Sequence, residues 1–325
     1  MANSAANVKV VQKGAHIGAE IQGVDLTQPV DDVTFKVIED AFVEHELLVF
    51  QNQPITSEQQ IEFAKKFGEL SVHPFSPNSD DTPELILFDN DAENPPFATD
   101  CWHSDETFRS DPPLATMLHG LVIPEVGGDT MFASMTSAYE GLSDRMKNFI
   151  SGLEAIHDFK PFRALFGDDE KSKEDLRYYE DRYPPILHPV ISKHPVSGKP
   201  VLFVNPQFTV QIKGMSEAES RNLLDQLFEQ SKIPEFQFRH HWAVDTVVVW
   251  DNRSTQHYAV HDYFPARRKL DRVTIKGSEV LPYSESADTQ SVKNNKSPLP
   301  DNPKIKHGDH KPKRELARQL EEAGN

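Results

Sequence analysis

The apolar residues of this chain are gathered in short runs rather than in long continuous segments. Residues 47–50 and 115–122 have the length and composition of buried strands, and loops that carry proline and glycine separate such runs. The regular alternation of strands and helices that indicates a parallel sheet is absent. We therefore expect an α+β protein whose short strands form a β-sandwich or barrel, with helices between some of them.

Three segments have the spacing of amphipathic helices. Residues 31–46 carry apolar side chains every three or four positions. Two further helices begin at capping boxes, formed by Thr56 with Gln59 and by Ser216 with Glu219. Each of these pairs predicts the first turn of a helix with an apolar inner face. Further strands are predicted at 85–88, 246–250 and 273–275.

A change of composition divides the chain. Residues 1–283 contain nearly all the predicted strands and helices and are expected to form one domain. Within it, a highly charged stretch at about 135–185 is predicted to be mostly helical, as a lid or insertion. Residues 284–325 are rich in polar residues and proline, so we expect a flexible tail. In that tail, Pro312 and Gly324 suit the two ends of a short helix.

Charge and composition exclude several classes of protein. Lys and Arg number 34 against 51 Asp and Glu, which gives a net charge of -17, the wrong sign for a nucleic-acid or anionic-membrane partner. No apolar run is long enough to cross a membrane, and the first residues lack the apolar core of a signal peptide. We therefore expect a cytoplasmic protein. The single cysteine excludes an intrachain disulfide and a cysteine-based zinc site.

Any metal chemistry must then use histidine and carboxylate ligands. In an extended segment residues i and i+2 face the same side, so His103 and Asp105 can bind one cation together. A distant histidine would complete the 2-His-1-carboxylate facial triad of non-haem Fe(II) enzymes. His307 and Asp309 repeat this spacing, but the polar tail around them offers nothing to hold their geometry. The pair at 103 and 105 is therefore the better candidate.

The third ligand should come from a later strand. Residues 250–257 end such a strand and carry His257. Arg268 and Arg272 follow on the returning segment, where a strand would point both to one face, roughly 13 Å apart. The planar fork of arginine suits a carboxylate or sulfonate, so two such residues near a metal indicate two anionic groups to be held. The plain alternative is that both belong to the charged surface run at 267–269.

Four motifs follow one another along the chain: His103-Ser104-Asp105, Gly127-Gly128-Asp129-Thr130, Trp250-Asp251-Asn252-Arg253 with His257, and Arg268 with Arg272. In this order they resemble the taurine dioxygenase family, which also includes alkylsulfatase and phenoxyalkanoate dioxygenases. The resemblance covers residues 21–277. It implies a double-stranded β-helix (jelly roll) flanked by helices. It also implies that His103, Asp105 and His257 bind Fe(II). Thr130 and Arg268 would hold 2-oxoglutarate, a co-substrate together with O₂.

The resemblance extends to the substrate. His73 and Arg272 match positions that receive a sulfonate, and Phe159 and Phe208 match aromatic lining positions. Thr99 stands where the taurine enzyme has an asparagine, which predicts a less polar alkyl chain than aminoethyl. The predicted function is an Fe(II)- and 2-oxoglutarate-dependent dioxygenase that hydroxylates a small anionic substrate, an organosulfonate or sulfate ester, with release of CO₂ and succinate.

Two alternatives remain open at this point. A phenoxyalkanoate or other carboxylate-directed dioxygenase of the same family would use the same iron and co-substrate residues. A more distant alternative is a metal-binding protein that is not an oxygenase, such as a zinc hydrolase or a sensor, but such a protein has no need of the pair Thr130 and Arg268. Family members often form dimers or tetramers, so a homo-oligomer is expected.

Overall fold

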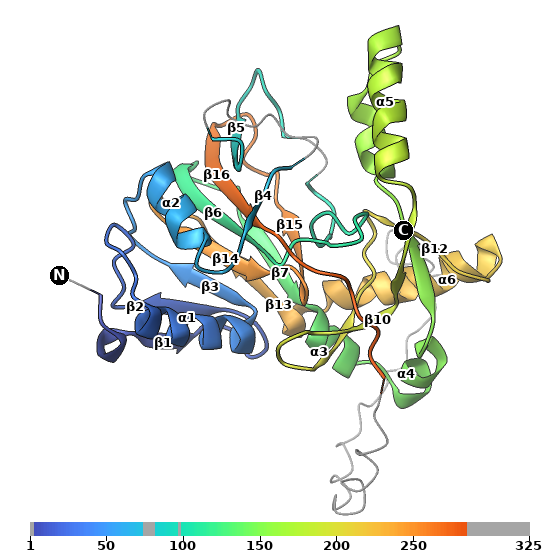
Figure 1. The fold of residues 1–325 in the computed structure, drawn as a ribbon, viewed down its shortest axis with the longest axis horizontal. Helices are drawn as coiled ribbons and strands as arrows, with labels where there is room; N and C mark the ends of the chain where they lie inside the picture. The colour runs from blue at the N-terminus through green and yellow to red at the C-terminus, as the bar shows by residue number, and fades with distance from the viewer. Residues whose placement is uncertain (1–2, 74–81, 97–98, 285–325) are drawn as a thin grey trace, which may run out of the picture. The chain divides into compact units, whose positions relative to one another are not determined.

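Two facing sheets of mainly antiparallel strands form the centre of the protein (Figure 1). The structure, a computed structural model, describes residues 3–73, 82–96 and 99–284. The polar tail predicted from 284 onwards, with its short helix, lies outside the described residues apart from its first residue. The domain boundary drawn there stays a prediction.

The larger sheet has eight strands. Seven follow the order β1-β2-β3-β14-β6-β16-β4, β5 also pairs with β16, and every pair is antiparallel except β2 with β3. The strands are β1 (Lys9–Gln12), β2 (Ala19–Gln22), β3 (Leu47–Phe50), β4 (Leu70–Ser71), β5 (Leu85–Asn90), β6 (Ala115–Val122), β14 (Val247–Asp251) and β16 (Arg268–Ile275). The strands predicted at 47–50 and 115–122 are confirmed.

The smaller sheet covers one face of the larger one. It has the order β13-β7-β15 and contains β7 (Thr130–Ser134), β13 (Gln237–His240) and β15 (Thr255–Ala259). Phe132 of β7 reaches across to Trp250 of β14, with 5.3 Å between ring centroids, inside a shared apolar cluster. Two facing antiparallel sheets that share a core are the arrangement expected of a jelly roll.

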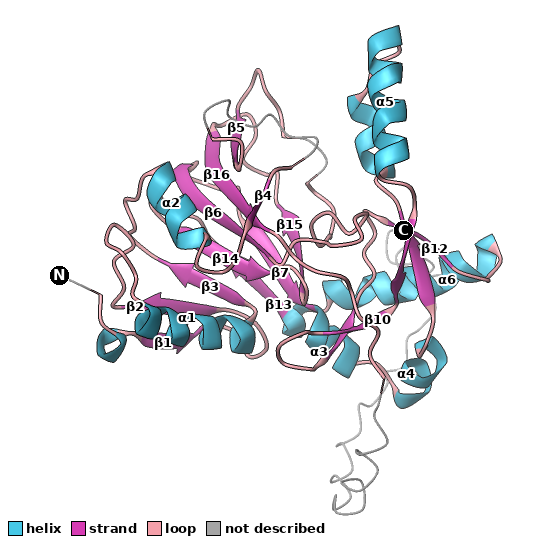
Figure 2. Cartoon of the chain, viewed as in Figure 1, coloured by secondary structure: helices cyan, strands magenta, loops and turns pink. Residues whose placement is uncertain are grey.

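Two helices cover the outer face of the larger sheet (Figure 2). They are α1 (Asp32–His45), capped by Asp31, and α2 (Ser57–Ala64), whose capping box joins Thr56 and Gln59 as predicted. Strand β3 is apolar throughout because both its faces are buried. Leu48 and Phe50 pack on the helix side, whereas Leu47 and Val49 pack between the sheets.

The region between β7 and β13 contains most of the remaining elements. Its helices are α3 (Met135–Glu140), α4 (Asp144–Ile150), α5 (Glu170–Arg182) and α6 (Glu217–Phe228), the last with the capping box predicted at Ser216. Two small sheets also lie there: β12-β8-β9 and β10-β11, with bounds β8 (Glu154–His157), β9 (Ile186–Pro189), β10 (Ile191–Lys193), β11 (Pro200–Leu202) and β12 (Thr209–Ile212). Short 3₁₀ helices occupy Ala5–Asn7, Lys160–Leu165, Glu229–Lys232 and Pro234–Phe236.

The helical prediction for 135–185 missed a strand. Strand β8 is the centre of its three-stranded sheet, and it buries Ala155 and His157 while Glu154 is exposed. This period of two is typical of a strand, but it is too short to show within a charged stretch. Among the described residues, no helix has the length and apolar composition needed to cross a membrane.

Candidate metal centre and substrate pocket

Three predicted ligands meet in one place. The Nε2 atoms of His103 and His257 each lie 3.8 Å from Oδ1 of Asp105. All three side chains are buried, and they are the only group of three His, Cys, Asp or Glu side chains with such mutual distances among the described residues. His261, which also lines the cavity, does not belong to this group. The geometry fits a single cation held by two imidazoles and a carboxylate.

The sheet positions both histidines through their backbones. His257 lies on β15, opposite Phe132 of β7. His103 pairs with His257 as an isolated β-bridge, with N–H to carbonyl distances of 3.0 and 2.8 Å in the two directions. The strand predicted at 246–250 ends at Asp251, and a turn at 252–254 reverses the chain and leads into β15, which carries His257. The extended segment expected at 103–105 stops after the bridge, and Asp105 begins a turn.

Asp105 is held from three sides. The side chain of Asn252 accepts a hydrogen bond from the Asp105 N–H at 2.6 Å and donates one to its carbonyl at 3.0 Å. The hydroxyl of Thr116 on β6 donates to Oδ2 at 2.6 Å, and the Arg272 guanidinium lies 3.1 Å from Oδ1. Oδ2 is thus fixed by a neutral donor, while Oδ1 points between the two histidines.

The protonation states fit a metal ligand set. Nδ1 of His103 lies 2.7 Å from the Cys101 carbonyl, which can only accept, so the proton is on Nδ1 and Nε2 keeps its lone pair. Burial lowers the pKa of both His103 and His257, which keeps the two rings neutral. Burial opposes ionisation of Asp105, but Arg272, the two histidines and the Thr116 hydroxyl together outweigh burial and lower the pKa of the carboxyl below its ordinary value. Two neutral imidazoles and a carboxylate suit Fe(II).

A cavity of about 380 Å³ opens onto these ligands. Both arginines predicted to face one side of β16 line it, and each is buried, with 7% exposure for Arg268 and 8% for Arg272. The alternative that they belong to a charged surface run is therefore wrong. Apolar walls come from side chains of the sheets and loops: Leu118, Phe162, Phe208, Trp250 and Leu270.

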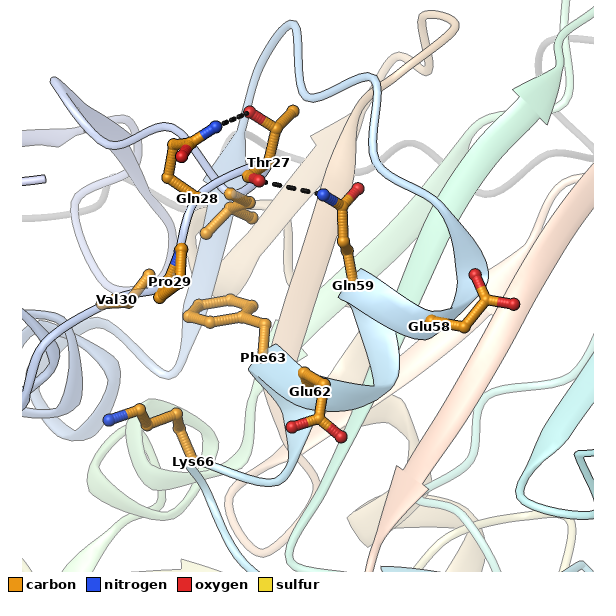
Figure 3. A pocket seen from close by; sticks show the side chains of 10 residues that line it. Thr27, Gln28, Pro29, Val30, Glu58, Gln59, Glu62, Phe63 and Lys66 are labelled. Carbon is orange, nitrogen blue, oxygen red and sulfur yellow. Dashed lines mark hydrogen bonds between the residues drawn. The ribbon is translucent and has the colours of Figure 1, made fainter. Parts of the chain in front are cut away.

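A second hollow, of about 450 Å³, lies on the outside between residues 26–30 and α2 (Figure 3). Gln59 crosses it, and its amide donates to the Thr27 carbonyl at 2.9 Å. Its acidic lining residues, Glu58 and Glu62, are exposed to solvent. The hollow is larger than the cavity at the histidines, but it has no buried ionisable group, so the chemistry assigns the site to the smaller cavity.

We name the surroundings of Arg268 the Arg268 subsite: Arg268, Thr130, Gly128, Trp242 and Tyr263. The Arg268 Nε donates to the Gly128 carbonyl at 2.9 Å, and an Nη2–H points to the Thr130 hydroxyl at 3.4 Å. The Trp242 indole also donates to this hydroxyl, and the guanidinium lies 5.7 Å from the Trp242 and Tyr263 rings. No described Asp or Glu forms an ion pair with Arg268.

Two consequences follow for the Arg268 subsite. Burial lowers the pKa of Arg268 to about 10, so the side chain stays charged at neutral pH without a protein counter-ion. The close approach of the Arg268 side chain to the backbone at residue 128 requires glycine there. Gly128 has a φ of 74°, and an added Cβ would lie 3.1 Å from the Arg268 Cδ. A buried and uncompensated guanidinium is suited to bind an anionic group.

The Arg272 subsite consists of Arg272, His73, Asp105, Glu106 and Arg109. Besides Asp105, Arg272 lies 3.9 Å from Oε1 of Glu106, and the His73 Nε2 lies 3.8 Å from the same oxygen. Oε2 of Glu106 accepts a hydrogen bond from Arg109 at 2.7 Å. Burial, with the charge of Arg272, lowers the pKa of His73 to about 3. Burial raises the pKa of Glu106 to about 7, against the charge of Arg109.

Two of the three remaining residues predicted to bind the substrate line the cavity, and the third does not. Thr99 lines it, with its hydroxyl 2.9 Å from the His261 ring, and Phe208 lines it 6.4 Å from the ring of His103. Phe159 is buried in a cluster with Phe108 and Phe208 and is absent from the lining. Sequence reasoning missed Phe162 and Glu106 as lining residues. The only signal for Glu106 was a charged residue directly after a metal ligand.

The fold and the site together define a class of protein. Facing antiparallel sheets that enclose two histidines and one carboxylate, beside a buried arginine, are typical of jelly-roll non-haem iron oxygenases. A family model described as "Taurine catabolism dioxygenase TauD, TfdA family" matches residues 9–274. The chain belongs to this family of Fe(II)/2-oxoglutarate-dependent dioxygenases, and it is a 2-oxoglutarate-dependent dioxygenase. The alternative of a metal-binding protein that is not an oxygenase is thereby set aside.

Several known proteins are similar over most of their length. An alkylsulfatase from Acinetobacter baylyi is 36% identical over 266 residues, which cover 80% of this chain and 82% of that protein. An alpha-ketoglutarate-dependent 2,4-dichlorophenoxyacetate dioxygenase from Cupriavidus pinatubonensis is 32% identical over 279 residues, 81% of this chain and 96% of that protein. The crystal structure of a taurine dioxygenase from Burkholderia xenovorans superposes with a TM-score of 0.72 at 33% identity, covering 85% and 93% of the two chains.

Proposed function

We propose that the protein oxidises a C–H bond of a small molecule that carries a compact anionic group, with an organosulfonate or sulfate ester as the first candidate. The observation that carries this proposal is the pair of buried arginines on one face of β16, both lining the cavity of the candidate ligands. Two anionic ligands are thus expected beside the metal. One is 2-oxoglutarate, and the other is the substrate.

In this proposal the chain's own residues divide into three groups. His103, Asp105 and His257 hold Fe(II), and Thr130 with Arg268 holds the distal carboxylate of 2-oxoglutarate. When bound, the iron with 2-oxoglutarate and O₂ supplies the oxidation of the C–H bond, and succinate and CO₂ are released. The facing sheets exclude water from this chemistry, because Trp250 and Phe132 pack against the ring of His257 at 4.7 and 6.2 Å.

The substrate anion is proposed to lie at Arg272 and His73. A guanidinium and the N–H of a neutral imidazole offer several donors to the three oxygens of a sulfonate or sulfate. Thr99 and Phe208 then line the space for the carbon chain, and Phe159 supports Phe208 from behind. If the oxidised carbon bears the sulfur group, the hydroxylated product collapses to an aldehyde and releases sulfite or sulfate. The similarity to an alkylsulfatase supports this choice.

A second candidate is a phenoxyalkanoate or other carboxylate-directed dioxygenase. It is favoured by the similarity to a 2,4-dichlorophenoxyacetate dioxygenase, of which the alignment covers 96%. Aromatic side chains of Phe162 and Phe208 in the lining would suit an aryl group. The iron and co-substrate residues would be unchanged.

We also propose that the protein acts in the cytoplasm as a homo-oligomer, a dimer or a tetramer, with a small anionic molecule as its ligand. Composition and the resemblance to the family support this. Sedimentation equilibrium of the full chain tests the assembly, and a strictly monomeric protein at micromolar concentration would contradict it.

A substrate panel tests the reaction. The Fe(II)-loaded enzyme is supplied with 2-oxoglutarate, O₂ and, in turn, taurine, a straight-chain alkanesulfonate, an alkyl sulfate or phenoxyacetate. We expect substrate-dependent release of CO₂ and succinate, with sulfite or sulfate as the second product. A phenoxyacetate kcat/KM more than about tenfold above the others, about 1.4 kcal/mol in transition-state binding, would favour the second candidate.

A further inference from the structure

One oxygen of the Glu106 carboxylate lacks a hydrogen-bond partner. Glu106 is 2% exposed and lines the cavity. Its Oε2 accepts from Arg109, but its Oε1 has no hydrogen-bond partner among the described residues. Nearly all buried polar atoms in native proteins are paired, so an unpaired acceptor at a cavity wall is available to a donor from water or from a ligand.

Oε1 borders the space proposed for the substrate anion. It lies 3.8 Å from the His73 Nε2 and 3.9 Å from the Arg272 Nη2, beyond hydrogen-bond distance of both. A head group held by these two donors therefore lies against Oε1 as well. Sulfonate and sulfate oxygens only accept hydrogen bonds, so they leave Oε1 of an ionised Glu106 without a donor.

Carboxyl groups of the chain already face both arginines of the Arg272 subsite. Arg272 and Arg109 face the carboxyl groups of Asp105 and Glu106 at 2.7 to 3.9 Å. An anion therefore gains less from Arg272 than from an unpaired arginine. A hydrogen-bond donor on the substrate, directed at Glu106, would offset this loss.

The backbone at Glu106 is held in an uncommon conformation. Its φ is 50°, in the left-handed region that a residue with a Cβ adopts rarely and at some cost. The loop is fixed on both sides, by Asn252 at Asp105 and by the His188 ring, whose Nε2 lies 3.0 and 2.9 Å from the carbonyls of Thr107 and Arg109. The surrounding structure therefore maintains a conformation that directs Glu106 into the cavity.

We propose that Glu106 is a specificity-determining residue: its Oε1 accepts a hydrogen bond from an O–H or N–H group that the substrate carries next to its anionic group. This rests on the proposed function, because it takes Arg272 and His73 as the anion site. It also revises the apolar chain expected from Thr99, since Thr99 is paired with His261 while Glu106 offers a free acceptor. The substrate class becomes a hydroxy- or amino-substituted sulfonate or sulfate ester.

Two sulfonates of equal charge and size test the proposal. 2-Hydroxyethanesulfonate and propane-1-sulfonate differ by one hydroxyl in place of a methyl group. Each is titrated without O₂ into enzyme loaded with Fe(II) and 2-oxoglutarate, and the change of the metal-to-ketoacid absorption band reports binding. Wild type should bind the hydroxy compound about tenfold more tightly.

Variants show whether Glu106 causes this preference. Glu106→Met keeps the side-chain length and removes the acceptor, so the preference should disappear. Glu106→Gln keeps an acceptor and contact with Arg109, so part of the preference should remain even if the methionine variant folds poorly. Glu46→Gln is the matched control, because Glu46 is a buried glutamate that does not line the cavity, and its preference should equal that of wild type.

The outcomes separate this inference from the proposed function. Equal binding of both sulfonates by wild type, or an undiminished preference in Glu106→Met, overturns the role of Glu106. If both compounds bind with the expected preference but neither is oxidised when O₂ is added, the sulfonate reaction fails while the role of Glu106 stands. Binding of neither compound overturns both.

Discussion

The Arg268 and Arg272 subsites differ although their arginines are closely matched. Both arginines lie on β16, face the same cavity and are buried to nearly the same degree. Arg268 is surrounded by two aromatic rings, a hydroxyl and a backbone carbonyl, with no described carboxylate in ion-pair contact. Arg272 lies 3.1 Å from Asp105 and 3.9 Å from Glu106.

The difference teaches that neighbours decide what a buried arginine can bind. The charge of Arg268 is left for a ligand, which suits a co-substrate carboxylate that must bind in every turnover. Arg272 already faces two carboxyl groups of the chain, so its subsite can discriminate among anions by hydrogen bonds rather than attract any anion by charge. Residue type and burial alone would not distinguish the two.

The largest effect is expected from substitution of the candidate metal ligands, one of which, Asp105, also belongs to the Arg272 subsite. Each of His103→Ala, Asp105→Ala and His257→Ala should abolish Fe(II) binding and turnover, because two protein donors are too few to hold the ion in place. Metal content after dialysis and CO₂ release measure this. His307→Ala and Asp309→Ala, in a segment outside the described residues, serve as controls and should behave as wild type. Near-normal turnover of Asp105→Ala would refute the assignment.

The next largest effect separates the two arginines directly. Arg268→Lys replaces a fork with a point charge and should raise the KM for 2-oxoglutarate about 10- to 100-fold, with the substrate KM unchanged. Arg272→Ala should raise the substrate KM by about tenfold, a smaller change because two carboxyl groups already face this guanidinium. Steady-state kinetics with each ligand varied in turn give both values. If both substitutions changed the same KM, the two arginines would not bind different ligands.

A smaller effect is expected from the support of Asp105. Thr116→Val removes the only neutral side-chain donor to Oδ2 among the described residues and should lower Fe(II) affinity by about tenfold, with the KM for 2-oxoglutarate unchanged. Competition with a metal chelator measures the affinity. Thr246→Val is the control, since that buried hydroxyl donates to Gln51, a residue that does not line the cavity. Equal affinities in both variants would show that the Thr116 contact is unimportant.

The last prediction concerns pH and the stability of the structure beside the Arg268 subsite. Burial lowers the pKa of His240 to about 4, and its ring lies 4.7 Å from that of Trp242. Because the unfolded chain takes up a proton that the folded ring resists, stability is full above the unfolded pKa of about 6.5 and is lost as the pH falls towards 4. Over this pH range the His240→Gln variant should lose about 1–3 kcal/mol less of its free energy of unfolding than wild type does. Urea denaturation at several pH values tests this, and parallel curves for the two proteins would contradict it.

The ligands and both arginines could be predicted because their signals are local. Spacing within a strand put Arg268 and Arg272 on one face, and capping boxes marked the starts of α2 and α6. The turn at Asp105, the position of Phe159 behind the cavity wall and the role of Glu106 depend on residues distant in sequence. Glu106 meets His73 and Arg272 only after the sheets have formed, so its position directly after a metal ligand could not reveal these neighbours.

The paired backbones of His103 and His257 have a consequence for the motions of the site. Each ligand's amide hydrogen is held by the other ligand's carbonyl, so neither can exchange with solvent until the two segments separate. The two histidines therefore open as one cooperative unit with β15, not as independent loops. Hydrogen exchange at these two amides should therefore report a single opening event at the metal centre.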